Sequence, residues 1–406
     1  MVEKKQPSEA DAALGKLEQK YAKTPWFASH KADINAARAE AKAAVAEGEA
    51  EKLYAQAAAL FKQNELFDLK PIIEKLKANY PKTRPVTDAE RKPSFAEMAD
   101  ATRNLGRFIT VRKDGKGDFR EIQDAINSAP ANSVVEIQDD GTYLVPAPNG
   151  VDLLKEGMTL RGKKGCWPIL AQGSWISSAL VSKPNVTIEH LVISYTFGPG
   201  DTNRQALGVA AGPFRVRSAI LHTYRWQAIV AKGGTQCEVQ GCVIIGSVSA
   251  LGPASIRDSV CLQMPVETGG SATFQNVVMP SLRANGPSEI RFCTVPGSIS
   301  LAQEPNLILD SILGRVESAK EGSRVERCDV LAGKAGYRGF AKPGSGCFSA
   351  DPQFRDPENF DYRLKPTSPC RKKASDGGDI GCRFTAEMLE VLEKAIELRK
   401  KGIIKF

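Results

Sequence analysis

A short repeat in the second half of the chain constrains the fold more than any other feature of the sequence. Eight segments begin with an apolar residue that recurs at intervals from 16 residues, as between Phe274 and Ile290, to 28 residues, as between Ile188 and Val216. Such spacing is typical of a solenoid in which each segment forms one turn. The residues at this first position are Ile188, Val216, Val239, Ile256, Phe274, Ile290, Leu309 and Val325.

Two further positions in each segment support this interpretation. The second position, two places later, is mostly small or polar, which suits a bend between short strands. The third position, three places later, is mostly apolar and is expected to stack inward from turn to turn. Because Cys242, Cys293 and Cys328 occupy it, we predict that they are buried and reduced, with no redox or metal role. The second position holds His190, Ser218, Gly241, Asp258, Asn276, Phe292, Ser311 and Arg327, and the third holds Leu191, Ala219, Cys242, Ser259, Val277, Cys293, Ile312 and Cys328.

Changes of pattern along the chain predict four segments. Residues 1–80 have apolar residues at helical spacing and are rich in Ala, Glu and Lys, which predicts a helical hairpin or a coiled-coil-like spacer. Residues 81–106 contain several prolines and are expected to be a linker. Residues 107–382 form the predicted solenoid, and 119–126 is an amphipathic segment that covers its first coil. Residues 383–406 are expected to form a helix that caps the rear end.

Composition narrows the classes of partner and bound group. The formal net charge of +8 favours acidic partners such as polyuronates, without identifying one. Nine cysteines cannot all pair, and none has zinc-ligand spacing, so we expect no metal site and no cofactor. Cys370 and Cys382 are the one pair with the potential to close a loop in an oxidising compartment. No apolar stretch is long enough to span a membrane, and the first residues do not form a secretory signal.

Several motifs resemble those of pectin methylesterases. Residues 108–130, FITVRKDGKGDFREIQDAINSAP, resemble the opening of that family, and Gly141-Thr142-Tyr143 resembles its first coil. RQALGV, HTYRWQAIV and GSVS then follow in the order and spacing of the family motifs QAVAL, GYQDTL and GTVDFIFG. The resemblance implies a right-handed parallel β-helix, mainly β, with an α-helical N-terminal segment and a C-terminal helix.

The resemblance also implies a site, although its catalytic groups differ from those of the family. Gln205 matches a glutamine that helps to hold the oxyanion, and Tyr224 matches the tyrosine of the second motif. Arg225 stands in place of that motif's glutamine, Trp226 in place of the acid aspartate, and Ser249 in place of the nucleophilic aspartate. Ester hydrolysis of this kind needs both carboxylates. We therefore expect no pectin methylesterase activity.

The end of the chain carries a second resemblance. Residues 351–382 contain DPQF, DYRL, SP and DIG in the order that closes many bacterial right-handed β-helix proteins. This resemblance implies a bacterial protein of the cell envelope, and it supplies no catalytic residue. The lack of a secretory signal leaves a cytoplasmic location open.

We interpret the chain as a non-catalytic module for carbohydrate binding or cell-surface sensing, with an acidic polysaccharide as partner and no nucleic acid. The expected ligand-binding residues are Gln205, Tyr224, Arg225, Trp226 and Ser249, in which Trp226 stacks on a sugar and Arg225 binds a carboxylate. One alternative is a carbohydrate esterase or polysaccharide lyase that uses other acidic residues. Another is a purely structural solenoid or stalk, in which Trp226 packs against a neighbouring coil.

Overall fold

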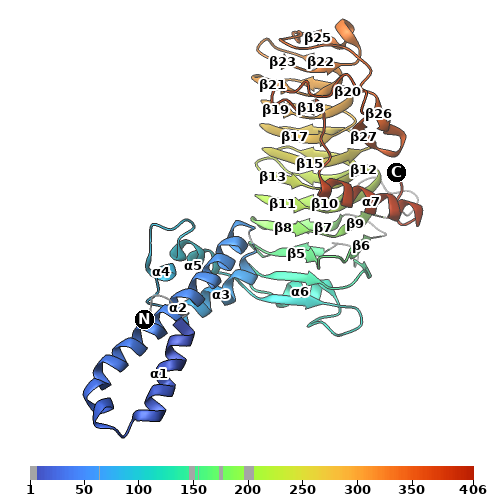
Figure 1. Cartoon of the computed structure of the whole chain (residues 1–406). Helices are drawn as coiled ribbons and strands as arrows, with labels where there is room; N and C mark the ends of the chain where they lie inside the picture. Colours follow the sequence, from blue (N-terminus) through green and yellow to red (C-terminus); the bar gives the residue numbers. More distant parts are fainter. Residues whose placement is uncertain (1–6, 64, 146–150, 154, 173–176, 196–204) are drawn as a thin grey trace. The chain divides into compact units, whose positions relative to one another are not determined.

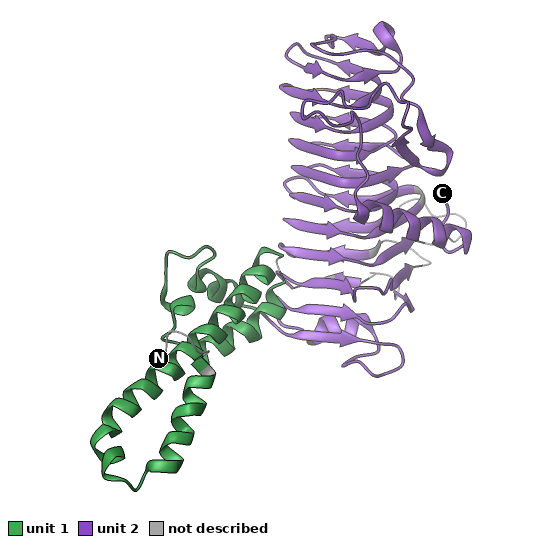
Figure 2. Ribbon diagram, in the orientation of Figure 1, with its two compact units in different colours: residues 1–105 green, residues 106–406 purple. Residues whose placement is uncertain are grey.

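The chain divides into two compact units. A computed structural model describes residues 7–63, 65–145, 151–153, 155–172, 177–195 and 205–406. The first unit is Met1–Leu105 and the second is Gly106–Phe406 (Figure 2).

The first unit is helical, as its Ala-rich sequence predicts. Its core gathers where α2, α3 and α5 pack together, around Ala50, Tyr54, Leu69, Leu76 and Met98. Among the described residues, none of the helices combines the length and the apolar character needed to cross a membrane. The helices are α1 (Pro7–Tyr21), α2 (Pro25–Lys62), α3 (Leu66–Asn79), α4 (Arg84–Thr87) and α5 (Phe95–Arg103).

The structure differs from the sequence prediction over residues 81–106, where we expected a linker. This segment contains α4 and α5, and α5 begins with a capping box in which Ser94 and Glu97 bond each other's backbone. Met98 of α5 is fully buried, and the Tyr54 hydroxyl donates a hydrogen bond to the carbonyl of Pro93. Each helix is short and buries few side chains, so its apolar pattern is weak. Among the prolines and charged residues of this segment, that weak pattern does not predict a helix.

The second unit is a parallel β-helix, which confirms the predicted fold class (Figure 1). Its strands pair in parallel with those of the preceding and following turns, and they form three faces of one continuous ladder. The first face contains β1 (Phe108–Val111), β2 (Val134–Ile137), β5 (Thr159–Gly162), β8 (Val186–Glu189), β11 (Phe214–Arg217), β13 (Cys237–Gln240), the start of β15 (Ala254–Leu262), the start of β17 (Ala272–Val278), β19 (Ser288–Arg291), β21 (Asn306–Leu309) and β23 (Arg324–Glu326).

The second and third faces share several long strands that bend from one face to the next. The second face contains β3 (Thr142–Leu144), β6 (Ile169–Gln172), β9 (Val192–Tyr195), the starts of β12 (Ile220–Ala231) and β14 (Val243–Ala250), the ends of β15 and β17, the starts of β20 (Thr294–Leu301) and β22 (Ile312–Ser318), and β24 (Asp329–Val330). The third face contains β4 (Val151–Leu153), β7 (Ser177–Val181), β10 (Gln205–Val209), the ends of β12 and β14, β16 (Val266–Thr268), β18 (Leu282–Ala284), the ends of β20 and β22, and β25 (Tyr337–Gly339).

The inward columns follow the sequence repeat with one slip. Val216, Val239 and Ile256 are register partners inside the first face, as predicted. In the next-to-last repeat, however, Ile308 occupies the column where we predicted Leu309, because Ile290 pairs with Ile308 and Ile308 with Val325. The bend after this strand accordingly lies at Asp310, whose φ is 53°. The bends of the other repeats have left-handed backbone at His190, Ser218, Gly241, Asp258, Asn276, Phe292 and Arg327, as the repeat predicts.

Two helices cover different parts of the β-helix. α6 (Ile122–Ser128) buries Ile122 and Ile126 against the first turn, as predicted. α7 (Ala386–Lys400) forms where predicted but does not cap the rear end. It lies along the second face, where Met388 and Leu392 pack with outward apolar residues such as Val243 (Figure 1). The second face needs this cover because its strands carry apolar residues on both sides.

The segment before α7 runs back along the bends between the first and second faces. Its hydrogen bonds join turns that are far apart in the sequence, in addition to the pairing of neighbouring strands. A short antiparallel hairpin of β26 (Phe354–Asp356) and β27 (Asp361–Leu364) precedes it, and the short helices η2 (Gly333–Gly336) and η3 (Pro357–Asn359) lie in nearby loops. The contacts of this segment are Ser375 and Gly381 with Asp310, Cys382 with Thr294 and Arg383 with Asn276, and Glu387 of α7 bonds Ser218.

All nine cysteines are free thiols. Cys242, Cys293 and Cys328 are buried in the core of the β-helix, as the repeat predicts. Cys370 and Cys382, which we considered as a pair, belong to separate apolar clusters. The Cys370 thiol instead donates a hydrogen bond to the buried carboxylate of Asp329.

The half-buried Cys347 is expected to react first with a thiol reagent. The neighbouring Cys328 thiol lowers the pKa of Cys347 to about 5, whereas burial raises the pKa of Cys242 and of Cys293 to about 12. Only the thiolate is nucleophilic, so iodoacetamide at about pH 6.5 should modify Cys347 at least about tenfold faster than any other cysteine. Peptide mapping by mass spectrometry gives the rates.

Cys166 is the matched control for this experiment, since it is also half-buried but burial raises its pKa. Labelling of Cys347 should slow as the pH falls through about 5, because the thiolate is then protonated. Equal rates for Cys166 and Cys347 at about pH 6.5 would contradict the expected thiolate.

Candidate functional site

The third face brings together three of the residues predicted from the motifs. Gln205 begins β10, Trp226 lies in the middle of β12, and Ser249 lies near the end of β14. β12 pairs with both other strands, and Gln205 is the register partner of Gln227, which in turn is the partner of Ser247. The three predicted residues therefore lie on three consecutive strands of one face.

Trp226 follows a local irregularity in β12. The register between β12 and β14 shifts between His222 and Gln227, and the Thr223 hydroxyl donates a hydrogen bond of 2.9 Å to the carbonyl of Trp226. Gly246 of β14 lies under this bulge with φ 125°, and a Cβ there would lie 2.6 Å from the same carbonyl oxygen. The bulge leaves the Trp226 side chain 37% exposed.

Ser249 lies in an outward column of polar residues. It is the register partner of Val230 on one side and of Glu267 on the other, and Glu267 forms a 3.3 Å ion pair with Arg283. The column continues through Ser300, Glu317 and Arg338. The side chains of Tyr224 and Arg225 lie outside the described part of the structure, so the predicted contact between Arg225 and a carboxylate stays a prediction.

The described residues place no histidine beside Ser249. His222 lies on the second face, where it hydrogen bonds Ser194 at 2.9 Å and the backbone of Lys405, and burial lowers its pKa to about 4. His190 lies at a bend and stacks on Trp167. Within this part of the chain, Ser249 therefore has no histidine to act as its base. Groups of three or more potential metal ligands are likewise absent from the described residues.

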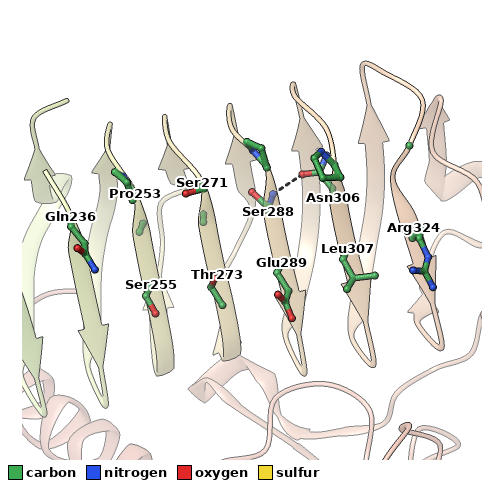
Figure 3. Close-up of a pocket in the computed structure, with 15 residues that line it drawn as sticks. Gln236, Pro253, Ser255, Ser271, Thr273, Ser288, Glu289, Asn306, Leu307 and Arg324 are labelled. Carbon is green, nitrogen blue, oxygen red and sulfur yellow. Dashed lines mark hydrogen bonds between the residues drawn. The ribbon is translucent and has the colours of Figure 1, made fainter. Parts of the chain in front are cut away.

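The first face carries two adjoining hollows that the motifs do not indicate. One, of about 570 Å³, extends across the strands from β13 to β23, and its floor is formed largely by hydroxyl and other small side chains (Figure 3). The other, of about 280 Å³, lies over β11 and β13 and is lined by Arg215, Arg217 and Arg257. Both hollows share Ser255 and Thr273, so together they form one channel, which we call the arginine trough.

The sequence does contain a signal for the arginine trough, in the residues beside the apolar positions of the repeat. In β15 and β17 the residues before the apolar position are Ser255 and Thr273, whereas in β11 both residues beside it, Arg215 and Arg217, are arginines. Small residues leave a depression between larger neighbours, and two arginines on one strand make its end positive. The family motifs do not indicate these first-face residues because the motif residues lie on the third face.

No protein-family description matches the chain, and no curated protein matches it in sequence. Among solved structures, a pectin methylesterase from carrot is similar over 60% of this chain and 88% of its own, with 12% identity and a TM-score of 0.37. The pectate lyase Pel9A matches over 68% and 95%, with 10% identity and a TM-score of 0.35. A pectin methylesterase from Aspergillus niger matches over 60% and 84%, with 12% identity and a TM-score of 0.32. The similarity lies at the level of the fold.

Proposed function

We propose that the β-helix is a non-catalytic module that binds an acidic polysaccharide along its third face, outside the cytoplasm. The observation that carries this proposal is the exposed side chain of Trp226, which lies between the strands of Gln205 and Ser249. An indole ring gives a sugar ring an apolar surface on which to stack, while neighbouring amide and hydroxyl groups bond its hydroxyls. The alternative role, in which Trp226 packs in the core, is not supported by this exposure.

The repeat of the third face suits a polymer more than a small molecule. Adjacent parallel strands are separated by about 4.8 Å, so similar polar positions recur at short and regular intervals. From β14 onward, Ser249, Glu267 and Arg283 present a hydroxyl, an anion and a cation in successive turns. An extended chain that lies across the strands meets one of these groups with each step, and a ligand that also extends along β12 from Val230 to Trp226 has the indole as its aromatic anchor.

The groups available at this position favour binding over ester hydrolysis. Neither Trp226 nor Ser249 provides a carboxylate, and Ser249 has no histidine beside it among the described residues. The carboxylate next in register, Glu267, is engaged by Arg283. Hydrolysis of a methyl ester requires an activated nucleophile and a proton donor, and these contacts supply neither.

The test is a titration of oligogalacturonate into the intact chain and into Trp226→Ala, measured by calorimetry. We expect the substitution to weaken binding by about tenfold or more, as the loss of one good stacking contact does. Thermal stability should change little because the side chain is exposed. Trp26, which is 50% exposed on α2, provides the matched control variant Trp26→Ala.

Three results would overturn the proposal. One is the absence of binding by the intact chain, and a second is equal affinity for Trp226→Ala and Trp26→Ala. The third is a loss of about 3 kcal/mol or more in the free energy of unfolding of Trp226→Ala, which is the effect of removing a core aromatic. Release of methanol from methylated pectin would instead favour the esterase alternative.

A further inference from the structure

The arginine trough contains two arginines, Arg217 and Arg257, whose guanidinium groups form no ion pair among the described residues, although Glu189 is the other register partner of Arg217. Arg217 is the register partner of Gln240, and Gln240 is the partner of Arg257, so an outward column reads arginine, glutamine, arginine. In the described part of the chain, neither guanidinium has a hydrogen bond or an ion pair. Arginines prefer carboxylates or phosphates in a forked geometry, so two unpaired ones in a hollow leave a site for an anion.

Other arginines of the same face are paired, which makes these two distinctive. Arg161 pairs with Glu136 at 3.0 Å, Arg215 with Glu238 at 2.9 Å, and Arg324 with Glu326 at 2.6 Å. The smaller hollow is lined by three arginines and one carboxylate, that of Glu238, so its formal charge is +3 − 1 = +2. A hollow concentrates the potential of such charges and attracts an anion more strongly than a flat surface does.

The remainder of the arginine trough is nearly neutral and rich in hydroxyl groups. Ser255, Ser271 and Thr273 lie on its floor, and Gln236 lies between the two hollows (Figure 3). Further along, the carboxylate of Glu289 is engaged by Arg291, and at the far end Arg324 is engaged by Glu326. Charge therefore changes along the trough, from a positive end around Arg217 and Arg257 to a neutral, hydroxyl-lined middle around Ser271 and Thr273.

We propose that the arginine trough binds an oligosaccharide in which acidic and neutral sugars alternate. Arg217 and Arg257 are separated by two strand spacings, or about 9.6 Å, with the neutral Gln240 between them. Alternating acidic and neutral sugars give a carboxylate at every second residue, which matches this order of side chains. The hydroxyl floor then receives the neutral sugars that follow.

The alternative anionic polymer is a single-stranded nucleic acid, and the lining disfavours it. Proteins that bind such strands stack the bases on aromatic side chains, and no aromatic residue lines either of these two hollows. This site is also independent of the proposed function, since Trp226 lies on the third face and the arginine trough on the first.

The experiment measures binding of an octasaccharide of alternating glucuronate and N-acetylglucosamine to the full chain by calorimetry. Compared with the intact chain, the double variant Arg217→Gln, Arg257→Gln should bind at least about tenfold more weakly, and with a flatter dependence on salt. The control is Arg355→Gln, which removes the same charge from an exposed strand arginine of β26 that lacks an ion pair in the described structure. This variant should bind as the intact chain does.

The carboxyl-reduced octasaccharide tests the role of charge, and it should bind no better than the double variant binds the acidic form. Absence of binding by the intact chain, or equal affinities for the double variant and Arg355→Gln, would overturn the proposal. Tighter, Arg257-dependent binding of an oligothymidylate of equal length would assign the trough to nucleic acid instead. A loss of binding only in Trp226→Ala would place the octasaccharide on the third face.

Discussion

Asp310→Ala is expected to lower the free energy of unfolding of the β-helix by about 3–5 kcal/mol, as the breaking of a buried ion pair does. The Asp310 side chain is fully buried, and it accepts a hydrogen bond of 3.0 Å from Arg327. It also accepts bonds from the backbone and the hydroxyl of Ser375, at 2.9 and 2.6 Å. Alanine leaves both donors of Ser375 without their acceptor and leaves the guanidinium with only its 3.4 Å contact to Glu326, and it is strained at φ 53°. Denaturant unfolding measures the change.

Asp310→Asn is the matched control for this prediction. Asparagine accepts left-handed backbone and keeps one acceptor oxygen for Ser375, but it loses the charge that faces Arg327. We expect it to lose clearly less stability than alanine. If both variants unfold within about 1 kcal/mol of the unsubstituted chain, the buried pair has no structural role, since surface pairs contribute about that much.

Gly246→Ala is expected to cost about 3 kcal/mol of unfolding free energy and to weaken ligand binding at Trp226. The backbone at Gly246 has φ 125°, a conformation nearly restricted to glycine. A Cβ would lie 2.6 Å from the carbonyl oxygen of Trp226 and would also clash with the Thr223 hydroxyl. Relief of both contacts requires the bulge in β12 to move, and the indole moves with it. Calorimetric titration and thermal unfolding of the same sample measure the two effects.

Gly234→Ala separates strain from steric contact in this experiment. Gly234 also has positive φ, at 80°, but a Cβ there would meet no atom within 4 Å. It should cost only about 1 kcal/mol, the penalty for a left-handed side chain, and it should leave binding unchanged. Similar losses of unfolding free energy from both substitutions would contradict this prediction. They would mean that the backbone of β14 moves to accommodate the new Cβ and does not fix the bulge in β12.

The fold could be predicted from the sequence because the residues that form its core and its bends also form the sequence repeat. Inward apolar positions such as Val216 and Phe274, each followed by a bend residue, specify one turn after another. The slip at Ile308 has a physical cause. Ile308 and Leu309 are both apolar, and Asp310 and Ser311 both suit a bend, so the sequence permits two registers and only the pairing with Ile290 distinguishes them.

The location of α7 and the candidate sites depends on features that the repeat does not encode. An amphipathic helix pattern indicates that α7 covers an apolar surface, but not whether that surface is the end or the side of the solenoid. The motifs placed Gln205, Trp226 and Ser249 on consecutive strands, whereas they gave no indication of the arginine trough. That channel depends on which outward residues lack partners, and lateral pairing such as that of Arg215 with Glu238 appears only in the folded structure.

The segment that carries Ser375, Arg383 and α7 has a consequence for how the β-helix loses its structure. In a solenoid, each turn contacts only its neighbours, so the ends tend to fray and unfolding spreads turn by turn. Here the last part of the chain bonds Asp310, Asn276 and several other bends, and α7 packs on β14 and β15 in one apolar cluster with residues of strands from β6 to β17. A turn in this span cannot open until the segment that carries Ser375, Arg383 and α7 detaches from it. Partial unfolding is thereby coupled over the whole span, which should melt in a single cooperative transition.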